Sequence, residues 1–248
     1  MKVLLVSLYH PELVRGGAQQ ICYELFTGLK ACEDIEPTLL AAIDPSFKSL
    51  YKSGAQITGF DGRDGEFLYL SRDYDYLWHR VSNPDLTKAF VEFLHLVKPD
   101  VIHFHHFLLL GIELLTLARR TLPNVRIVLT FHEFMSICDA NGHMLRKFDR
   151  TLCTRASPVR CHQCFPDRVP EHFFMREMWF KKHLSVVDAF TSPDYHLGGT
   201  DQKGFFLGTN VGLGTRSSVI LRYSATRPID AVPGFEINEW FLDFLGRF

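Results

Sequence analysis

Hydrophobic and polar positions along residues 1–197 form two kinds of segment. Short apolar runs are typical of buried strands, and longer segments with an apolar residue every three or four positions are typical of helices. The expected strands are residues 3–8, 38–43, 55–60, 100–104, 125–131 and 188–191, and the expected helices are residues 18–29, 83–97, 111–122 and 171–187. Because strands alternate with helices, we predict an α/β fold with a parallel sheet.

The pattern changes near residue 198. Glycines recur between residues 198 and 214, and neither a helical nor a strand period is sustained over this stretch. One closing helix is expected at residues 236–244. We therefore predict an irregular C-terminal tail at residues 198–248.

Charge and composition exclude some classes of function. The 248 residues carry 27 basic and 28 acidic side chains, and a near-neutral balance gives no support to nucleic-acid binding. No stretch reaches the roughly 18–20 apolar residues that span a bilayer, and the N-terminal apolar run reads as a strand rather than a signal peptide. We expect a cytoplasmic protein, with peripheral membrane contact left open.

Paired glycines follow the first expected strand. Gly16 and Gly17 lie directly before the first expected helix, where glycines allow close backbone approach and positive φ angles. The free N–H groups at a helix start favour a diphosphate or another anion. The alternative is a flexible turn that only lets helix and strand pack. The dinucleotide pattern G-x-G-x-x-G is absent, which disfavours a hydride-transfer enzyme.

Histidines cluster where two expected strands end. His103, His105 and His106 accompany residues 100–104, and His132 and Glu133 follow residues 125–131. Ligands of open α/β sheets bind at the carboxyl ends of strands, and imidazoles there can bind sugar hydroxyls or phosphate oxygens or move protons. The alternative for each is a hydrogen-bonded structural residue.

Four cysteines lie close together in the sequence. Cys138, Cys153, Cys161 and Cys164 would complete a tetrahedral zinc site in a segment that lacks a core of its own. Their spacing is not that of a standard zinc finger. Two disulfides, reduced buried thiols and a redox-active C-x-x-C are the alternatives.

Together these motifs resemble the N-terminal domain of family-4 retaining glycosyltransferases, which have the GT-B fold. The matching pieces are residues 2–8 leading into 15–19, residues 98–106, residues 128–133, the cysteine segment and residues 187–193. The resemblance covers residues 1–197, and the cysteines resemble a bacterial sub-group that builds polysaccharides and surface glycans. It implies a Rossmann-like, acceptor-side domain with a Cys-rich insertion at residues 133–168.

The resemblance also implies roles for individual residues. His132 would contact the transferred sugar as the catalytic residue, and Gly16 and Gly17 would approach the donor diphosphate or an acceptor group. His105, His106 and Glu133 would bind substrate, although the family usually has Asp at the position of Glu133. Because the leaving diphosphate helps to deprotonate the acceptor, no protein nucleophile is required.

The implied activity is hexosyl transfer from a UDP- or GDP-hexose to a glycan or lipid-linked acceptor. The donor domain of the family is not recognised in residues 198–248, which suggests a truncated or frame-shifted reading. The chain is therefore expected to be the acceptor-binding half, inactive alone or working with a separate donor-domain chain. The alternative is a non-catalytic glycan- or partner-binding module stabilised by a zinc-like cysteine site.

Overall fold

The computed structural model describes residues 1–50, 55–153, 157–191, 202–212, 217–228 and 237–246, the last three as backbone alone. Two compact units follow one another along the chain, Met1–Ser192 and Pro193–Phe248. None of the described helices is long and apolar enough to cross a membrane.

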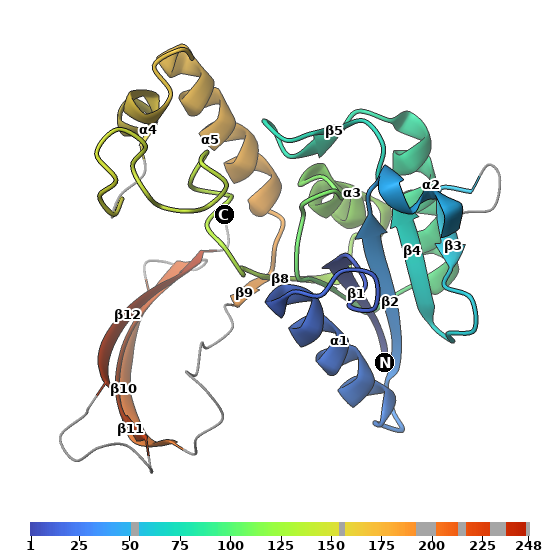
Figure 1. The fold of residues 1–248 in the computed structure, drawn as a ribbon. Helices are drawn as coiled ribbons and strands as arrows, with labels where there is room; N and C mark the ends of the chain where they lie inside the picture. The colour runs from blue at the N-terminus through green and yellow to red at the C-terminus, as the bar shows by residue number, and fades with distance from the viewer. Residues whose placement is uncertain (51–54, 154–156, 192–201, 213–216, 229–236, 247–248) are drawn as a thin grey trace. The chain divides into compact units, whose positions relative to one another are not determined.

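A seven-stranded sheet forms the centre of the first unit (Figure 1). Its order is β3-β4-β2-β1-β7-β8-β9, and every neighbouring pair is parallel except β3 and β4. The strands are β1 Lys2–Leu8, β2 Glu36–Ile43, β3 Ile57–Gly59, β4 Glu66–Leu70, β7 Val101–Phe104, β8 Arg126–Thr130 and β9 Ala189–Thr191. This confirms the predicted Rossmann-like α/β class. It corrects two details, because β4 was not predicted and β3 makes the sheet mixed.

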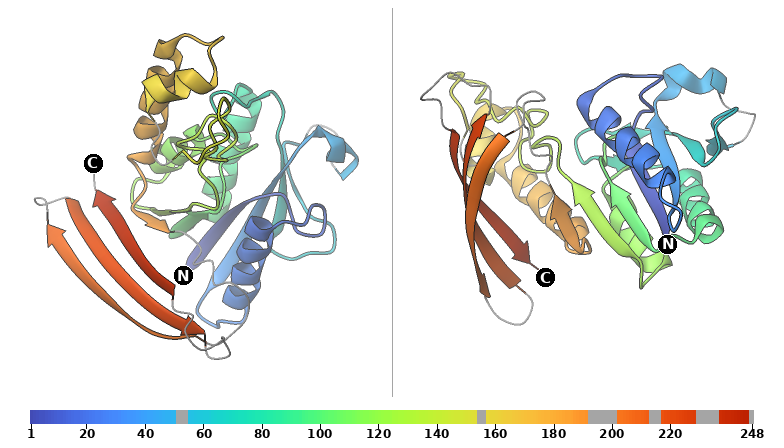
Figure 2. Two further views of the ribbon diagram at one scale, coloured as in Figure 1. Left: turned by 60° about the vertical axis from the view of Figure 1, so that its left-hand side comes forward. Right: turned by 90° about the horizontal axis from the view of Figure 1, so that it is seen from below.

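Helices cover both faces of this sheet, as the right panel of Figure 2 shows. On one face α1 (Gly17–Lys30) packs over β1 and β2 through Cys22 and Phe26. On the other face a larger core joins α2 (Pro84–Val97), α3 (Glu113–Thr121) and α5 (Pro170–Leu184). Because β1 is buried on both faces, its sequence is a continuous apolar run.

The ends of α2 follow from its sequence. The side chain of Asn83 accepts a hydrogen bond of 3.0 Å from the N–H of Asp85, and Pro84 occupies the first turn. The helix ends at Lys98, whose φ of 49° is left-handed. The predicted start of this helix is thereby confirmed.

Smaller elements connect these layers. They are the 3₁₀ helix η1 (Pro45–Leu50), the hairpin strands β5 (Tyr74–Asp75) and β6 (Arg80–Val81), and the short helix α4 (Pro158–Cys164). The hairpin and α4 were not predicted. The segment between β8 and α5 also contains a bridge between Leu145 and Leu152, so it is less irregular than expected.

The second unit holds three antiparallel strands, β10 (Gln202–Gly212), β11 (Ser217–Pro228) and β12 (Ile237–Gly246). They replace the expected irregular tail and closing helix. In the sequence of β12, Ile237, Trp240, Phe241 and Phe244 recur at helical spacing, which is why a helix was predicted. Pairing with β11, together with an aromatic composition that suits strands, outweighs this local signal.

Hydrogen exchange tests this second unit. Since β11 pairs on both sides and β10 and β12 on one side each, we expect the amides of residues 217–228 to exchange most slowly within 193–248. Mass spectrometry of exchanged peptides, with β1 as the protected reference, measures this. Exchange of the β11 amides at the rate of an unstructured peptide would contradict the pairing.

Candidate functional site

The predicted residues meet at the switch point of the sheet. From β1 the chain runs outward to β2 on one side, and β7, β8 and β9 later extend the sheet on the other side. Gly16 and Gly17 follow β1, His105 and His106 follow β7, and His132 and Glu133 follow β8. All six residues therefore lie near the carboxyl ends of three adjacent parallel strands, where ligands of open α/β sheets bind.

His105 joins two of these strand ends. Its Nδ1 lies 3.2 Å from Nε2 of His132, and the two rings stack with centroids 5.4 Å apart. The ring of His103, inside β7, lies 4.2 Å from that of His105. Nε2 of His103 is 2.7 Å from Oγ1 of Thr130 on β8. The side chain of His103 therefore contacts both His105 and the neighbouring strand.

Burial keeps these imidazoles uncharged. It lowers the pKa of His105 to about 2, with further lowering by His103, His132 and His106. Burial and then His132 lower the pKa of His103 to about 4, and burial and then His106 lower the pKa of His132. His105 is 3% exposed, and its Nε2 has no hydrogen-bond partner within the described part of the chain. One polar atom at the strand ends is thus buried and unpaired.

Hydrogen bonds at both ring nitrogens fix the tautomer of His106. The N–H of Leu108 donates to Nδ1 of His106 at 2.9 Å, so the neutral ring carries its proton on Nε2. That N–H donates to Oε1 of Glu133 at 2.5 Å. Burial alone would raise the pKa of Glu133, but the hydrogen bond from His106 and the nearby histidines lower it instead. The carboxylate of Glu133 is therefore hydrogen-bonded to the ring of His106.

A histidine–carboxylate pair of the same kind lies after β1, and the sequence pattern did not predict it. The N–H of Glu12 donates to Nδ1 of buried His10 at 3.2 Å, and Nε2 of His10 lies 2.7 Å from Oε2 of Glu66. Burial lowers the pKa of His10 more than Glu66 raises it, so the ring is neutral and donates to the carboxylate. This pair anchors the loop that leads to Gly16. The sequence does contain a signal for His10. Like His106 and His132, it lies two residues after the end of a strand.

His79 is another residue that was missed. It lies on the β5–β6 hairpin with a left-handed φ of 48°, and its Nδ1 is 2.9 Å from the Tyr74 hydroxyl. Burial and then Arg176 and His106 lower its pKa to about 4. Its electrostatic coupling to His106 and Glu133 shows that the hairpin borders the site. A single histidine in an unpatterned segment gave no sequence signal.

The glycine turn differs from the expectation in one respect. Gly16 has a φ of −167°, which is extended, and Gly17 begins α1, so positive φ is not the reason for glycine here. A Cβ on Gly16 would meet the side chain of Gln19, whereas one on Gly17 would meet nothing within 4 Å. No side chain caps α1, so the N–H groups of its first turn receive no side-chain hydrogen bond at the cap.

The zinc site proposed at the four cysteines of the insertion stays a prediction. Within the described ranges, no group of three or more His, Cys, Asp or Glu side chains is placed to hold a metal ion. The thiols sit on separate features, since Cys138 ends a turn, Cys153 lies beside the Leu145–Leu152 bridge, and Cys161 and Cys164 lie on α4. Burial, then Cys138, Asp139 and Cys153, raise the pKa of Cys161, so its thiol lies within electrostatic range of those of Cys138 and Cys153.

A buried ion pair between Arg176 and Asp139 holds the insertion in place. Nε of Arg176 on α5 lies 2.6 Å from Oδ1 of Asp139, and both side chains are 5% exposed. Arg168 donates to the other oxygen of Asp139 at 2.6 Å. Arg176 also donates to the carbonyl oxygens of Met135 and Leu77, which lie before the cysteines and on the β5–β6 hairpin. One arginine thus ties the insertion, the hairpin and α5 together.

A groove of about 560 Å³ lies elsewhere, between β3 and α2, lined by Ile57, Lys88 and Phe93 among others. Since β3 is the edge strand on the far side of β2, this groove is not part of the histidine cluster, which consists of His103, His105, His106 and His132.

Comparison with known protein families gives two matches. Residues 15–164 match the family described as Glycosyltransferase Family 4, a range that contains both glycines, the histidine cluster, Glu133 and the four cysteines of the insertion. Residues 181–248 match a family described as "Putative porin". No curated protein matches the chain.

Proposed function

The chain belongs to glycosyltransferase family 4, and from this premise we propose that residues 1–191 are the acceptor-side half of a retaining hexosyltransferase. In this proposal a UDP- or GDP-hexose is the donor and a glycan or lipid-linked sugar is the acceptor. The match at residues 181–248 lies mostly in the second unit and plays no part in the proposal.

His105 carries the argument. Its Nε2 is buried without a hydrogen-bond partner in the described residues, which costs about 1–3 kcal/mol, and in this proposal a sugar hydroxyl satisfies it. Its ring stacks on His132, the residue proposed to contact the transferred sugar. Because both rings are neutral near pH 7, they suit the uncharged hydroxyl groups of a hexose.

The diphosphate is assigned to the turn after β1. The uncapped N–H groups of α1 carry partial positive charge, and the open space at Gly17 lets an anion approach the backbone. The His10–Glu66 pair would hold this turn in place. The His106–Glu133 pair is proposed to bind substrate hydroxyls beside His132.

The proposed chemistry requires positioning rather than a nucleophile. The bond between the anomeric carbon and the donor diphosphate breaks, and the acceptor oxygen bonds to the same face of the sugar. The acceptor proton passes to the departing diphosphate. The protein then contributes by orienting the two sugars and by stabilising charge at the diphosphate.

One Rossmann-like domain is present in the described ranges, and the described strands of the second unit are antiparallel. We propose that these 248 residues bind substrate without turnover, and that hexose transfer also requires a donor domain of the family. We place the reaction in the cytoplasm, which cell fractionation would check.

Ligand titration tests the proposal. We expect UDP-glucose or GDP-mannose to perturb NMR signals of His105, His132 and Gly17, without hexose transfer to any acceptor. His105→Ala is expected to weaken binding about tenfold, the effect of one lost hydrogen bond of about 1.4 kcal/mol.

His95→Ala serves as the matched control, because His95 is exposed on α2 and far along the sequence from the strand ends. Equal affinity of the two variants would refute the site. Sustained hexose transfer by the purified chain would refute the proposed lack of turnover while leaving the site itself in place.

A further inference from the structure

The first residue after β1 has an unusual backbone conformation. Tyr9 has a φ of 54°, in the left-handed region that a bulky side chain rarely adopts. Its N–H donates to the carbonyl oxygen of Ala42 at 2.8 Å, and its own carbonyl accepts from the Ser7 hydroxyl at 3.2 Å. The neighbouring strand therefore holds a strained residue in place, and such residues cluster at functional sites.

The hydroxyl of Tyr9 reaches the end of the neighbouring strand. It donates to Oδ2 of Asp44, the first residue after β2, at 2.6 Å, and the N–H of Ser46 donates to Oδ1 at 2.7 Å. An ionised carboxylate accepts roughly four hydrogen bonds, so acceptor positions remain on both oxygens. Because Asp44 is only partly buried, a ligand can reach these positions.

The ionisation states of this pair restrict the ligand. Burial alone would raise the pKa of Asp44, but hydrogen bonds from Ser46 and Tyr9 lower it overall, so the side chain is a carboxylate at neutral pH. Burial and then Asp44 raise the pKa of Tyr9, whose hydroxyl therefore keeps its proton. Since the pair presents acceptors and a negative charge, it disfavours a diphosphate and favours a ligand that donates hydroxyl hydrogens.

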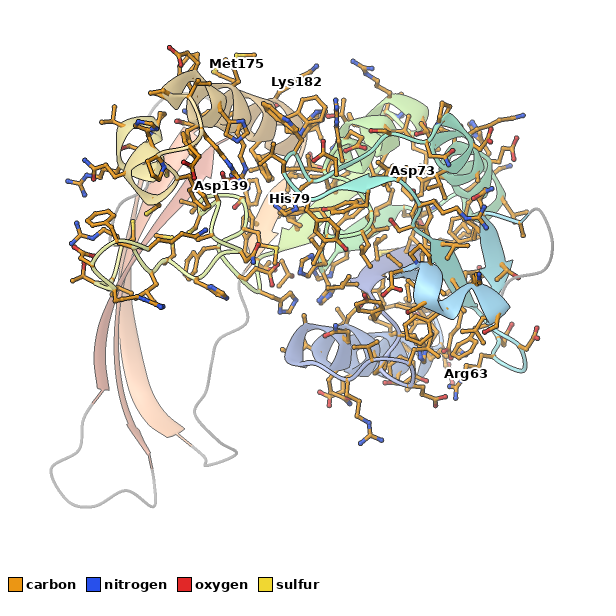
Figure 3. All side chains as sticks on the ribbon, turned by 45° about the horizontal axis from the view of Figure 1, so that its top comes forward. Arg63, Asp73, His79, Asp139, Met175 and Lys182 are labelled. Atoms are coloured by element: carbon orange, nitrogen blue, oxygen red, sulfur yellow. The ribbon has the colours of Figure 1, made fainter. Side chains whose placement is uncertain are left out.

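An exposed aromatic ring lies close to this pair. Tyr76, on the turn of the β5–β6 hairpin, is 65% exposed, and its ring centroid is 4.9 Å from that of Tyr74. Tyr76 contributes to the raised pKa of Tyr9, so the two hydroxyls lie within electrostatic range. His79, labelled in Figure 3, lies on the same hairpin and is coupled to His106. The hairpin thus links the exposed ring to the edge that carries the histidine cluster.

Together these side chains have the chemistry of a carbohydrate site. A single exposed ring needs no explanation, and a tyrosine–carboxylate hydrogen bond can serve packing alone. Here, however, three separate segments bring an open ring, a hydroxyl and a carboxylate to the edge of the sheet where ligands bind. A sugar ring matches them, because it has an apolar C–H face for the aromatic ring and hydroxyl groups for the acceptors.

We propose that Tyr9, Asp44 and Tyr76 form the subsite for the acceptor sugar. The sugar packs its C–H face on Tyr76, and its hydroxyl groups donate to the carboxylate of Asp44 and the oxygen of Tyr9. Calling this sugar the acceptor rests on the proposed function. The location does not, since the subsite lies at the ends of β1 and β2 and the histidine cluster at the ends of β7 and β8.

Sugar binding by the purified 248-residue chain tests the subsite. The probes are the methyl α-glycosides of glucose, galactose, mannose and rhamnose, and we expect at least one to shift the NMR signals of Tyr9 and Tyr76. Asp44→Asn is expected to weaken binding at least about tenfold, because it removes a charged acceptor. Tyr9→Phe, which keeps the ring, and Tyr76→Ser, which removes it, are each expected to weaken binding about fivefold.

Matched controls lie away from these strand ends. Asp34→Asn changes an exposed carboxylate just before β2, at the opposite end of the same strand, and Phe148→Ser changes a ring that is 53% exposed on the insertion. Both should leave glycoside binding unchanged. Tyr76→Ser should also leave the response of His105 to UDP-glucose unchanged, and circular dichroism checks that each variant is folded.

The possible outcomes separate this subsite from the donor site. If none of the four glycosides binds while UDP-glucose still shifts His105, the subsite is refuted and the proposed function stands. If a glycoside binds and the Asp44 and Tyr76 variants weaken it while UDP-glucose does not bind, the subsite stands and the donor site is refuted. Binding of glucosamine in place of every neutral glycoside would make the ligand a cation held by Asp44 and Tyr76, and would overturn the assignment.

Discussion

The variant Asp139→Ala is expected to lose about 3–5 kcal/mol of unfolding free energy, the largest effect expected of any single substitution in the insertion. Asp139 is 5% exposed and receives hydrogen bonds from both Arg176 and Arg168. Removing the carboxylate leaves the guanidinium of Arg176 buried with two backbone carbonyls as its remaining partners. Urea denaturation followed by tryptophan fluorescence measures the loss.

Two controls separate the burial of charge from the loss of contacts. In the double variant Asp139→Leu with Arg176→Met no unpaired charge is left from this pair, so it should be more stable than Asp139→Ala. Lys88→Ala breaks an exposed pair with Glu92 and should cost about 0.5 kcal/mol or less. A cost below about 1 kcal/mol for Asp139→Ala would show that water reaches the pair and that the insertion is not held by it.

Acidification from pH 6.5 to 5 is expected to destabilise the first unit by up to about 6 kcal/mol. Burial lowers the pKa of His79, His103 and His183 to about 4 and that of His105 to about 2. The unfolded chain therefore binds more protons than the folded chain below pH 6.5. Stability from these imidazoles is complete above that pH and is lost as the pH falls, by about 1.4 kcal/mol per pH unit for each.

Glu113 acts in the opposite direction. Burial raises the pKa of its carboxyl to about 7, so the folded chain holds this proton between pH 4.5 and 7 where the unfolded chain does not. Its contribution rises as the pH falls and offsets one of the four imidazoles, which leaves the net figure of about 6 kcal/mol.

Urea denaturation at pH 7, 6 and 5 checks this balance. Glu113→Gln removes the opposing group and should make the loss steeper by about 1.4 kcal/mol per pH unit. Leu96→Ser changes an exposed side chain that carries no titrating proton and should leave the slope as it is. Equal stability at pH 7 and 5 would mean that the buried imidazoles are protonated in the folded chain.

Buried polar residues connect α5, α3 and the β5–β6 hairpin. Arg176 contributes to the low pKa of His79, and the carbonyl of His79 accepts a hydrogen bond from Ile112 at the start of α3. His183, on the buried face of α5, lies 2.7 Å from the Thr116 hydroxyl on α3. Helix α5 and the edge that carries the histidine cluster are therefore held by the same buried polar residues.

The sequence alone determined the α/β class, the helix start at Asn83 and the placement of glycines and histidines after strands. Each of these is a local property. Apolar runs, hydrophobic periods and capping residues act within a few positions, and parallel strands bring their carboxyl ends to one edge whatever the details of packing.

The tertiary structure decided the rest. The pairing of His10 with Glu66 joins residues 56 positions apart, and no local period signals it. The outer face of α5 is the clearest case, because the sequence predicted the helix but Arg176 turned inward and Phe174 outward. β12 adopts an extended conformation despite a helical period, because its partner strand satisfies its backbone. Such outcomes depend on contacts between residues that are far apart in the sequence, and the local pattern of hydrophobic and polar residues does not encode those contacts.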